Sequence, residues 1–225
     1  LAAATYAGIY ADAVKANTGL SIANGMYVLA GGTAGVFVVR DPSRNAMPML
    51  RTTFKAGAKA IGGARLYVTA RGIYEVFLNG RRVGDDYYNP GLTQYNRTHM
   101  YQTYDVTSLI KPGANALGAM LGEGWWSGLL SFGNIWNHFG DRQSLLAKLV
   151  ITYRDGSSET ITTSERTWKY YGKGPVVYSS LDFGEIHDAT REAAVAGWST
   201  AAYNDRAWKP AVVVPLEGTT FAGME

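Results

Sequence analysis

Hydrophobic and polar residues alternate along much of the chain, most clearly over residues 64–71 and 74–78. An apolar side chain at every second position predicts half-buried β-strands, because successive side chains of a strand point to opposite faces. Asn79-Gly80 then predicts a type I′ hairpin turn, which needs positive φ at both central residues. A short returning strand, Arg81–Val83, is expected to end at Gly84 and to deliver the loop that follows to one edge of a sheet.

Further short strands are expected at regular intervals along the chain. They are 26–30, 35–40, 50–54, 98–107, 116–121, 145–153, 158–163, 168–171, 176–178 and 211–214. The run 116–121 is continuously apolar, which is typical of a strand buried on both faces. A helical turn is expected only at 11–16. About ten short strands separated by turn residues predict an all-β fold, an antiparallel β-sandwich or jelly roll.

The composition agrees with a β domain that has many turns. Of 225 residues 27 are glycine, 12% are aromatic and 17% are charged, which suits such a fold better than a helical one. The strand pattern places a jelly-roll module at 46–215. Residues 1–45 are expected to be an N-terminal extension of uncertain structure, and 216–225 a tail or linker.

Charge and cysteine content exclude several classes of protein. The net charge is +3 and the basic residues are scattered, so a nucleic-acid partner has little support. Cysteine is absent, which rules out disulfides and cysteine metal sites. No apolar run reaches the roughly 18–20 residues of a membrane helix. We therefore expect neither a nucleic-acid nor a membrane partner.

No catalytic signature stands out. A glycosidase needs two carboxylates roughly 5–10 Å apart, and Asp85 and Asp86, being adjacent, point to opposite faces when extended. The chain lacks a nucleophile elbow, a zinc-protease motif and a glycine-rich phosphate loop. The histidines have no metal-ligand spacing: His99, His138 and His187. We do not expect this fragment to be an enzyme, and the one pair to check for an active site is Glu123 with Asp86.

Two loops carry the groups that sugar recognition needs. Sugars offer apolar C–H faces that stack on aromatic rings, and hydroxyl groups that bond to carboxylates and amides. The first loop holds Asp85, Asp86 and Tyr87. The second, 122–140, holds Glu123, Trp125, Trp126, Asn134, Trp136, Asn137 and His138. Ca²⁺ prefers oxygen ligands, so Asp85, Asp86 and Asn134 would form a ligand set if the two loops meet.

Each of these features also has a purely structural interpretation. Asp85-Asp86 can be a solvated turn or a cap for a backbone group, and at least one of Trp125 and Trp126 is expected in the core. Glu185 and Asp188 are better explained by bonds to backbone amides than by ligand binding. The remaining tryptophans outside the second loop are expected to be packing residues: Trp168, Trp198 and Trp208.

Several segments resemble one family in consistent order over residues 47–215. They are ARLYVTARGIYEVFLNGRRVGDDYYNPGLTQY, YQTYDVTSLIKPGANALGAMLGEGWWSG, GDRQSLLAKLVITYRDGSSETI, GEIHDATRE and GWSTAAYNDRAWKPA. This pattern resembles the N-terminal β-sandwich module of α-L-rhamnosidases of glycoside hydrolase family 78. The resemblance implies a jelly roll that precedes an (α/α)6 barrel, which hydrolyses terminal α-L-rhamnosides. The barrel and its catalytic acids are not among these residues, so the fragment is expected to lack hydrolase activity.

The chain is also similar to carbohydrate-binding modules of family 67, which bind terminal L-rhamnose with the help of Ca²⁺. By position, the resemblance implies Asp85, Asp86 and Asn134 as metal and sugar ligands, near Trp125 or Trp126. Asp86 departs from the amide that binding members carry. The other sugar-binding candidates are Tyr87, Asn137 and His138.

The expected function is therefore non-catalytic, Ca²⁺-assisted recognition of rhamnose-capped glycans in polysaccharide degradation, in a secreted or periplasmic polypeptide. The alternative is a structural support domain that packs on a catalytic domain of the same polypeptide and binds no ligand. That alternative predicts no metal, and an exposed apolar patch where the barrel would sit.

Overall fold

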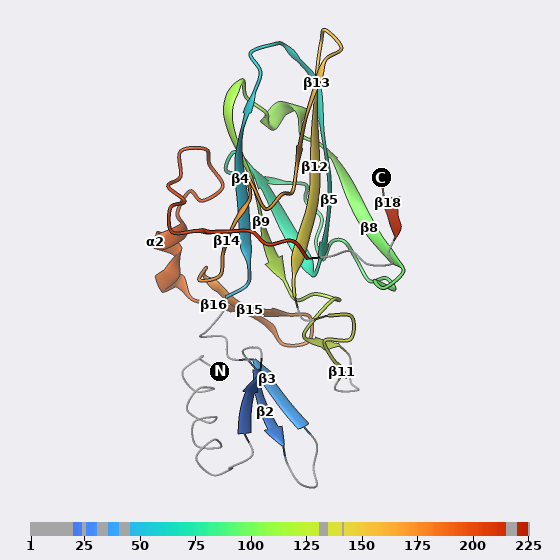
Figure 1. The fold of residues 1–225 in the computed structure, drawn as a ribbon, viewed down its shortest axis with the longest axis vertical. Coiled ribbons are helices and arrows are strands. Elements are labelled where there is room, and N and C mark those ends of the chain that lie inside the picture. The colour runs from blue at the N-terminus through green and yellow to red at the C-terminus, as the bar shows by residue number, and fades with distance from the viewer. Residues whose placement is uncertain are drawn as a thin grey trace.

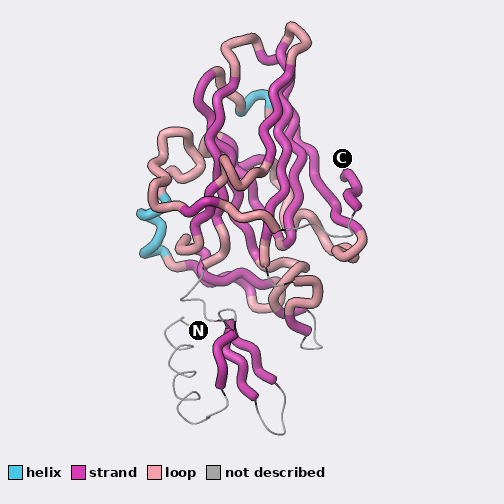
Figure 2. The backbone as a smooth tube through the Cα atoms, in the orientation of Figure 1, coloured by secondary structure: helices cyan, strands magenta, loops and turns pink. Residues whose placement is uncertain are grey.

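The alternating segments form two packed β-sheets in a computed structural model of the chain (Figure 1). The structure describes residues 20–23, 26–30, 36–40, 46–130, 135–140, 142–214 and 220–224. Strands dominate the described chain, and the helical elements are short (Figure 2). The all-β sandwich expected from the sequence is confirmed.

One sheet has five strands in the order β13-β12-β5-β8-β18. Their bounds are β13 Ser158–Thr162, β12 Ser144–Tyr153, β5 Ile61–Arg71, β8 Thr98–Asp105 and β18 Thr220–Met224. Neighbouring strands are antiparallel except for β18, which pairs with β8 in parallel. The segment 216–225, expected as a tail or linker, therefore includes a strand at this sheet's edge.

The other sheet has six strands in the order β17-β14-β4-β9-β6-β7. Their bounds are β17 Lys209–Pro210, β14 Lys169–Tyr171, β4 Met49–Ala56, β9 Gly113–Gly122, β6 Ile73–Leu78 and β7 Arg81–Val83. Of the eight residues of β9 from Asn115 to Gly122, seven are buried and one is half-buried, as the continuous apolar run predicted. Asn79 (φ 52°) and Gly80 (φ 85°) form the predicted turn between β6 and β7.

The chain changes sheets at Gly72, which has φ 119°. A Cβ there would lie 2.4 Å from the carbonyl oxygen of Gly122, so only glycine fits without a shift of the backbone. The two alternating segments at 64–71 and 74–78 therefore belong to different sheets, and the hairpin consists of β6 and β7 alone. Both segments still turn their apolar residues to one core between the sheets, for example Leu66 and Leu78, each fully buried.

Smaller elements complete the described chain. Three antiparallel strands, β1 Leu20–Ala23, β2 Met26–Ala30 and β3 Val36–Arg40, form a separate sheet. Two strand pairs are β10 Leu129–Leu130 with β11 Ile135–Trp136, and β15 Val176–Ser180 with β16 Gly184–His187. The helical turns are η1 Thr107–Leu109, η2 Ala189–Arg191 and α2 Glu192–Val195. In this described part of the chain, no helix has the length and apolarity to cross a membrane.

Two sequence expectations near the termini have different outcomes. The strands expected at 26–30 and 35–40 are confirmed as β2 and β3, whereas the helical turn at 11–16 lies outside the described residues. The strand expected at 211–214 is wrong: the segment is irregular, and Val212 and Val213 are 77% and 66% exposed. Among the described residues no strand pairs with this segment, and its one backbone hydrogen bond to them runs from the Ala211 amide to the carbonyl oxygen of Trp168, the residue before β14.

Residues 192–210 cover the outer face of the six-stranded sheet through stacked aromatic rings. The Trp208 ring lies 6.0 Å from Trp198 and 5.4 Å from Tyr171. Together with Met49 and Val195, both tryptophans form a second buried cluster, and Trp168 is buried in the main core. The packing role expected for these three tryptophans is confirmed.

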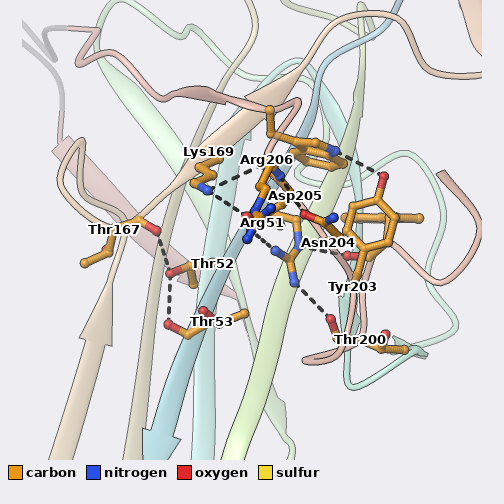
Figure 3. A network of polar contacts seen from close by, with 12 residues as sticks. Arg51, Thr52, Thr53, Thr167, Lys169, Thr200, Tyr203, Asn204, Asp205 and Arg206 are labelled. Atoms are coloured by element: carbon orange, nitrogen blue, oxygen red, sulfur yellow. Dashed lines mark hydrogen bonds and ion pairs between the residues drawn. The ribbon is translucent and has the colours of Figure 1, made fainter. Parts of the chain in front are cut away.

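A buried ionic network fixes the same segment (Figure 3). Arg51 on β4 is 1% exposed and donates to the carbonyl oxygens of Trp198 (2.8 Å) and Thr200 (2.9 Å). Its guanidinium also pairs with Asp205, which accepts from Lys169 Nζ at 2.6 Å. All three nitrogens of the Arg51 guanidinium donate to residues of the segment 198–205, so the network acts as a brace that holds this segment on the sheet.

Candidate functional site

The two loops that the sequence singled out lie at the same end of the sandwich. β5 ends at Arg71, which pairs with Ser144 at the start of β12. Ile73 at the start of β6 pairs with Gly122 at the end of β9. The loop 84–97, which leads from β7 to β8, and the described parts of the segment 123–143, which leads from β9 to β12, therefore lie at the same end, the lower end of the sandwich in Figure 1.

The carboxylate of Asp86 is exposed but held by a tyrosine of β8. The Tyr104 hydroxyl donates to Asp86 Oδ2 at 2.8 Å, and Asn89 Nδ2 donates to the Tyr104 oxygen at 3.0 Å. Burial, with the hydrogen bond and charge of Asp86, raises the pKa of Tyr104 to about 12. The phenol therefore stays protonated at neutral pH and remains a donor to the carboxylate.

The far side of the loop is tied into the core. Tyr74 on β6 places its hydroxyl between Gln102 Oε1 and the carbonyl oxygen of Val68. Burial raises the pKa of Tyr74 well above its usual range, so it too stays a neutral phenol. Gln102 Nε2 donates to the Pro90 carbonyl at 3.3 Å, and the Tyr74 amide donates to the Asn89 carbonyl at 3.2 Å. Residues 89–90 are thus held by hydrogen bonds to β6 and β8.

Arg82 at the end of the hairpin holds the exposed side of the loop. Its guanidinium donates to the carbonyl oxygens of Gly84 (3.0 Å) and Asp86 (2.5 Å). Its Nε lies 3.3 Å from Glu75 Oε1, and its Cζ lies 4.8 Å from the centre of the Tyr87 ring. Tyr87 is nevertheless 72% exposed, so its ring is oriented by Arg82 without being covered.

Asp85 has no structural contact through its side chain among the described residues. It is exposed, and its carboxylate makes no hydrogen bond or ion pair with any residue that the structure describes. Neither Asp85 nor Asp86 caps a backbone amide there. Of the predicted site residues, Asp85, Asp86 and Tyr87 are thus brought together on one fixed and exposed loop.

The second loop turns most of its aromatic residues inward. Trp126 is 7% exposed, and its ring packs 5.6 Å from Tyr95 and 6.4 Å from Phe139. The guanidinium carbon of Arg71 lies 4.7 Å from the same ring. A Cβ at Gly140 would overlap the indole, so the chain closes tightly over it. The expectation that at least one of the two adjacent tryptophans is core is confirmed by Trp126, while Trp125 is half-buried.

Two histidines flank this aromatic cluster and differ in environment. His99 on β8 is 1% exposed and packs 5.3 Å from the Tyr95 ring. Burial, and then the charge of Arg71, lower the pKa of His99 to about 4, so it is neutral near pH 7. His138 is exposed, and its ring meets Phe139 edge-on at 4.6 Å.

The remaining predicted residues of the second loop differ in their environments. The side-chain oxygen of Asn137 accepts from the backbone amide of Gly128 at 2.8 Å, and the backbone amide of Asn137 donates to the Gly128 carbonyl oxygen at 2.9 Å. Glu123 is 4% exposed beside Gly128, where a Cβ would overlap its carboxylate. Asn134 lies outside the described residues. Elsewhere, Asp188 accepts from the Thr190 amide at 3.1 Å, the backbone role that the sequence favoured.

The two loops meet through Tyr95, which sequence reasoning did not select. Its hydroxyl donates to the Gly91 carbonyl at 2.6 Å, and its ring contacts Trp126 and Phe139. Arg82 and Tyr104 were also missed. Their contacts to the loop depend on how β7 and β8 are placed by the fold, and no local motif marks them.

The donor chemistry at Asp85 and Asp86 is that of a hard cation such as Ca²⁺, since both residues offer carboxylate oxygens. Within the described ranges, no group of three or more His, Cys, Asp or Glu side chains is placed to hold a metal ion. A cation at the acidic pair would need carbonyl, amide or water oxygens as its further ligands. Asn134 is the amide that the sequence offers for this.

Comparison with known proteins identifies one family. The model of the alpha-L-rhamnosidase N-terminal domain matches residues 59–224. An alpha-L-rhamnosidase of Streptomyces avermitilis is 44% identical over 182 residues, which are 80% of this chain and 17% of the relative. An alpha-L-rhamnosidase of Formosa agariphila is 36% identical over 187 residues, covering 82% of this chain and 20% of the relative. The chain thus spans about a fifth of the length of these relatives.

The fold is similar to that of solved structures from the same group. The Streptomyces avermitilis alpha-L-rhamnosidase complexed with L-rhamnose has a TM-score of 0.70 and 39% identity, covering 80% of this chain and 18% of that one. The native Aspergillus terreus enzyme has a TM-score of 0.71 and 32% identity, covering 84% of this chain and 24% of that one.

Proposed function

The chain belongs to the family of alpha-L-rhamnosidase N-terminal domains, as its sequence suggested, and from this premise we propose that it is a non-catalytic module that recognises terminal L-rhamnose. The ligand is a rhamnose-capped glycan, and the site is the loop 84–91. In the full polypeptide the module acts beside a catalytic domain, in a secreted or periplasmic location.

The observation that carries this proposal is that the loop is fixed yet exposed. Tyr104 and Arg82 hold Asp86 and its backbone, while Asp85 and Asp86 are both exposed residues. Tyr87 presents a ring that Arg82 orients. Sugar recognition uses these two features together: carboxylates that accept hydrogen bonds from the sugar hydroxyls, and an oriented aromatic ring on which the apolar face of the sugar stacks. Because the loop is ordered beforehand, binding does not have to supply the free energy of ordering it.

Calcium assistance is part of the proposal. The donor set fits, since Asp85 and Asp86 are exposed carboxylates, and both would hold the cation with Asn134. A bound Ca²⁺ would supply a positive centre for vicinal sugar hydroxyls. The protein's own residues keep Asp86 oriented through Tyr104 and leave Asp85 free of local partners among the described residues.

The burial of Glu123 supports a non-catalytic role. Glycoside hydrolysis needs two carboxylates facing one bound sugar. Glu123 is 4% exposed and lies against Gly128, whereas Asp86 is exposed on the other loop. This pair, the one candidate for an active site on the sandwich, does not share an open cleft. Rhamnoside hydrolysis would belong to a part of the polypeptide beyond these residues.

A structural role as a support domain is the second candidate. It is favoured by Val212 and Val213, which are 77% and 66% exposed directly after β17. Adjacent exposed valines offer apolar surface that a contact with another domain would cover. The two roles use different surfaces and are compatible with each other.

Calorimetric titration of the chain with L-rhamnose tests the proposal, first with Ca²⁺ and then with excess chelator. We expect binding that chelation removes, and that Asp85→Ala and Asp86→Ala both abolish. Asp182→Ala, an acidic residue of another turn, is the matched control and should bind like the wild type. Binding that survives chelation would refute the calcium part. Absence of binding in both conditions would refute sugar recognition and leave the support role.

A further inference from the structure

Tyr88 has an unusual backbone conformation. Its φ is 61°, in the left-handed region that glycine, asparagine and aspartate adopt most readily and that bulky residues rarely adopt. Contacts on its C-terminal side hold the conformation, since the Gly91 amide donates to the Tyr88 carbonyl at 3.1 Å and Asn89 is bonded to Tyr104 and Tyr74. An asparagine or glycine would fit this position with less strain.

Packing does not explain why a tyrosine stands there. The side chain is 63% exposed, and it makes no hydrogen bond or ring contact with any residue in the part of the chain that the structure describes. The residue therefore combines backbone strain with an exposed apolar ring, and neither stabilises the fold. Strained residues kept in such places are typical of functional sites.

The neighbours of Tyr88 indicate what the ring would meet. It follows Tyr87 directly, so its Cα lies about 3.8 Å from that of the oriented tyrosine, and the acidic pair precedes both. The loop thus displays two consecutive exposed tyrosines, at 72% and 63% exposure, beside two carboxylates. Rings this close can contact two neighbouring units of one glycan, because every pyranose unit has an apolar face that stacks on an aromatic ring.

We propose that Tyr88 forms a second subsite, which stacks on the sugar unit next to the terminal rhamnose. The loop then selects a rhamnose-capped disaccharide or longer glycan over free L-rhamnose. This inference rests on the proposed function of the same loop. It adds the class of ligand and the residue that reads its second unit.

The test compares affinities for L-rhamnose and for two disaccharides that carry a terminal α-L-rhamnose, rutinose (1→6 linked) and neohesperidose (1→2 linked). Calorimetric titration in the presence of Ca²⁺ gives the ratio of affinities. For the wild type we expect at least one disaccharide to bind about threefold to tenfold more tightly than L-rhamnose. In Tyr88→Ala and Tyr88→Asn that ratio should fall to about one.

Tyr88→Asn and one control variant separate the loss of the ring from misfolding. Tyr88→Asn removes the ring and relieves the backbone, so its thermal midpoint should equal or exceed that of the wild type while the ratio still falls. Phe183→Ala removes a 63% exposed ring from another turn and should keep the wild-type ratio. A wild type that binds L-rhamnose but neither disaccharide more tightly overturns the inference, as does a Tyr88→Asn variant that keeps the preference. A wild type that binds none of the three sugars overturns the proposed function instead.

Discussion

Replacing Arg82 by lysine tests whether the order of the loop 84–91 comes from the hairpin. The substitution keeps the charge and most of the side-chain length but removes the planar fork that reaches two carbonyl oxygens at once. Arg82 donates to Gly84 and Asp86 through different nitrogens, while its Nε faces Glu75. A single ammonium group cannot occupy these three positions together.

The expected cost follows from those contacts. Two hydrogen bonds to carbonyl oxygens contribute about 0.5–1.5 kcal/mol each, and the Arg82 side chain is only partly exposed at 27%. The exposed ion pair with Glu75 adds at most about 1 kcal/mol, and lysine can keep it. We therefore expect about 1–2 kcal/mol less loop stabilisation, which lowers the affinity for L-rhamnose by at most roughly fivefold to thirtyfold, the limit reached when the loop is largely disordered in the variant.

Two measurements check this expectation. Calorimetric titration gives the affinity, and hydrogen exchange of the amides of residues 85–88 gives the opening of the loop directly. Arg81→Lys is the matched control, because Arg81 is an exposed neighbour on the same strand. If Arg82→Lys matches Arg81→Lys in both measurements, Arg82 does not order the loop. The exchange result decides this even for a protein that binds no sugar.

The remaining predictions concern the scaffold. Asp205→Asn leaves the buried Arg51 without its counter-charge and should lower the free energy of unfolding by about 3 kcal/mol in urea titrations. Lys169→Met leaves the ion pair between Arg51 and Asp205 in place and should cost less than about 1 kcal/mol. Equal losses in the two variants would contradict the bracing role of this network. Gly118→Ala places a Cβ 2.4 Å from a buried tryptophan ring and should cost about 1–3 kcal/mol, while Gly172→Ala, with nothing within 4 Å, should change little. The pKa of His99 is about 4 in the folded protein, below its unfolded value, so between about pH 6.5 and pH 4 the folded state binds fewer protons at this residue than the unfolded state. The free energy of unfolding should therefore fall as the pH drops through that window. His99→Gln should make the free energy of unfolding depend less on pH there, and an unchanged dependence would show that His99 is not its source.

The strands could be predicted from the sequence because their alternation reflects burial directly. The continuous apolar run at 116–121 has both faces covered, since the core lies on one side of β9 and the Trp198 ring packs at Gly118 on the other. The same reasoning failed at 211–214. There the apolar residues follow the last strand of the six-stranded sheet and pair with no described strand. Apolar composition alone does not reveal whether a partner strand lies alongside.

The candidate site could be predicted only as an inventory of residues. Asp85, Asp86 and Tyr87 were identified because a hairpin turn and a cluster of polar and aromatic residues are local features. The residues that give them their places are distant in sequence or hidden in strands: Tyr104 lies 18 positions after Asp86. Trp126 shows the converse, because an aromatic residue in a glycine-rich loop suggests display, yet the loop folds it against Tyr95.

The order of the loop is therefore a property of the sheets as much as of the loop itself. Three strands from the two sheets each contribute one anchor: Tyr74 from β6 and Arg82 from β7 in one sheet, and Tyr104 from β8 in the other. Two of these anchors face the core, where their hydroxyl groups stay protonated because burial raises their pKa. Packing of the sandwich and orientation of Asp86 thus depend on the same side chains. A rigid scaffold of this kind leaves the exposed tip, residues 85–88, free to carry side chains such as Tyr88 that contribute nothing to folding and that recognition of a glycan would explain.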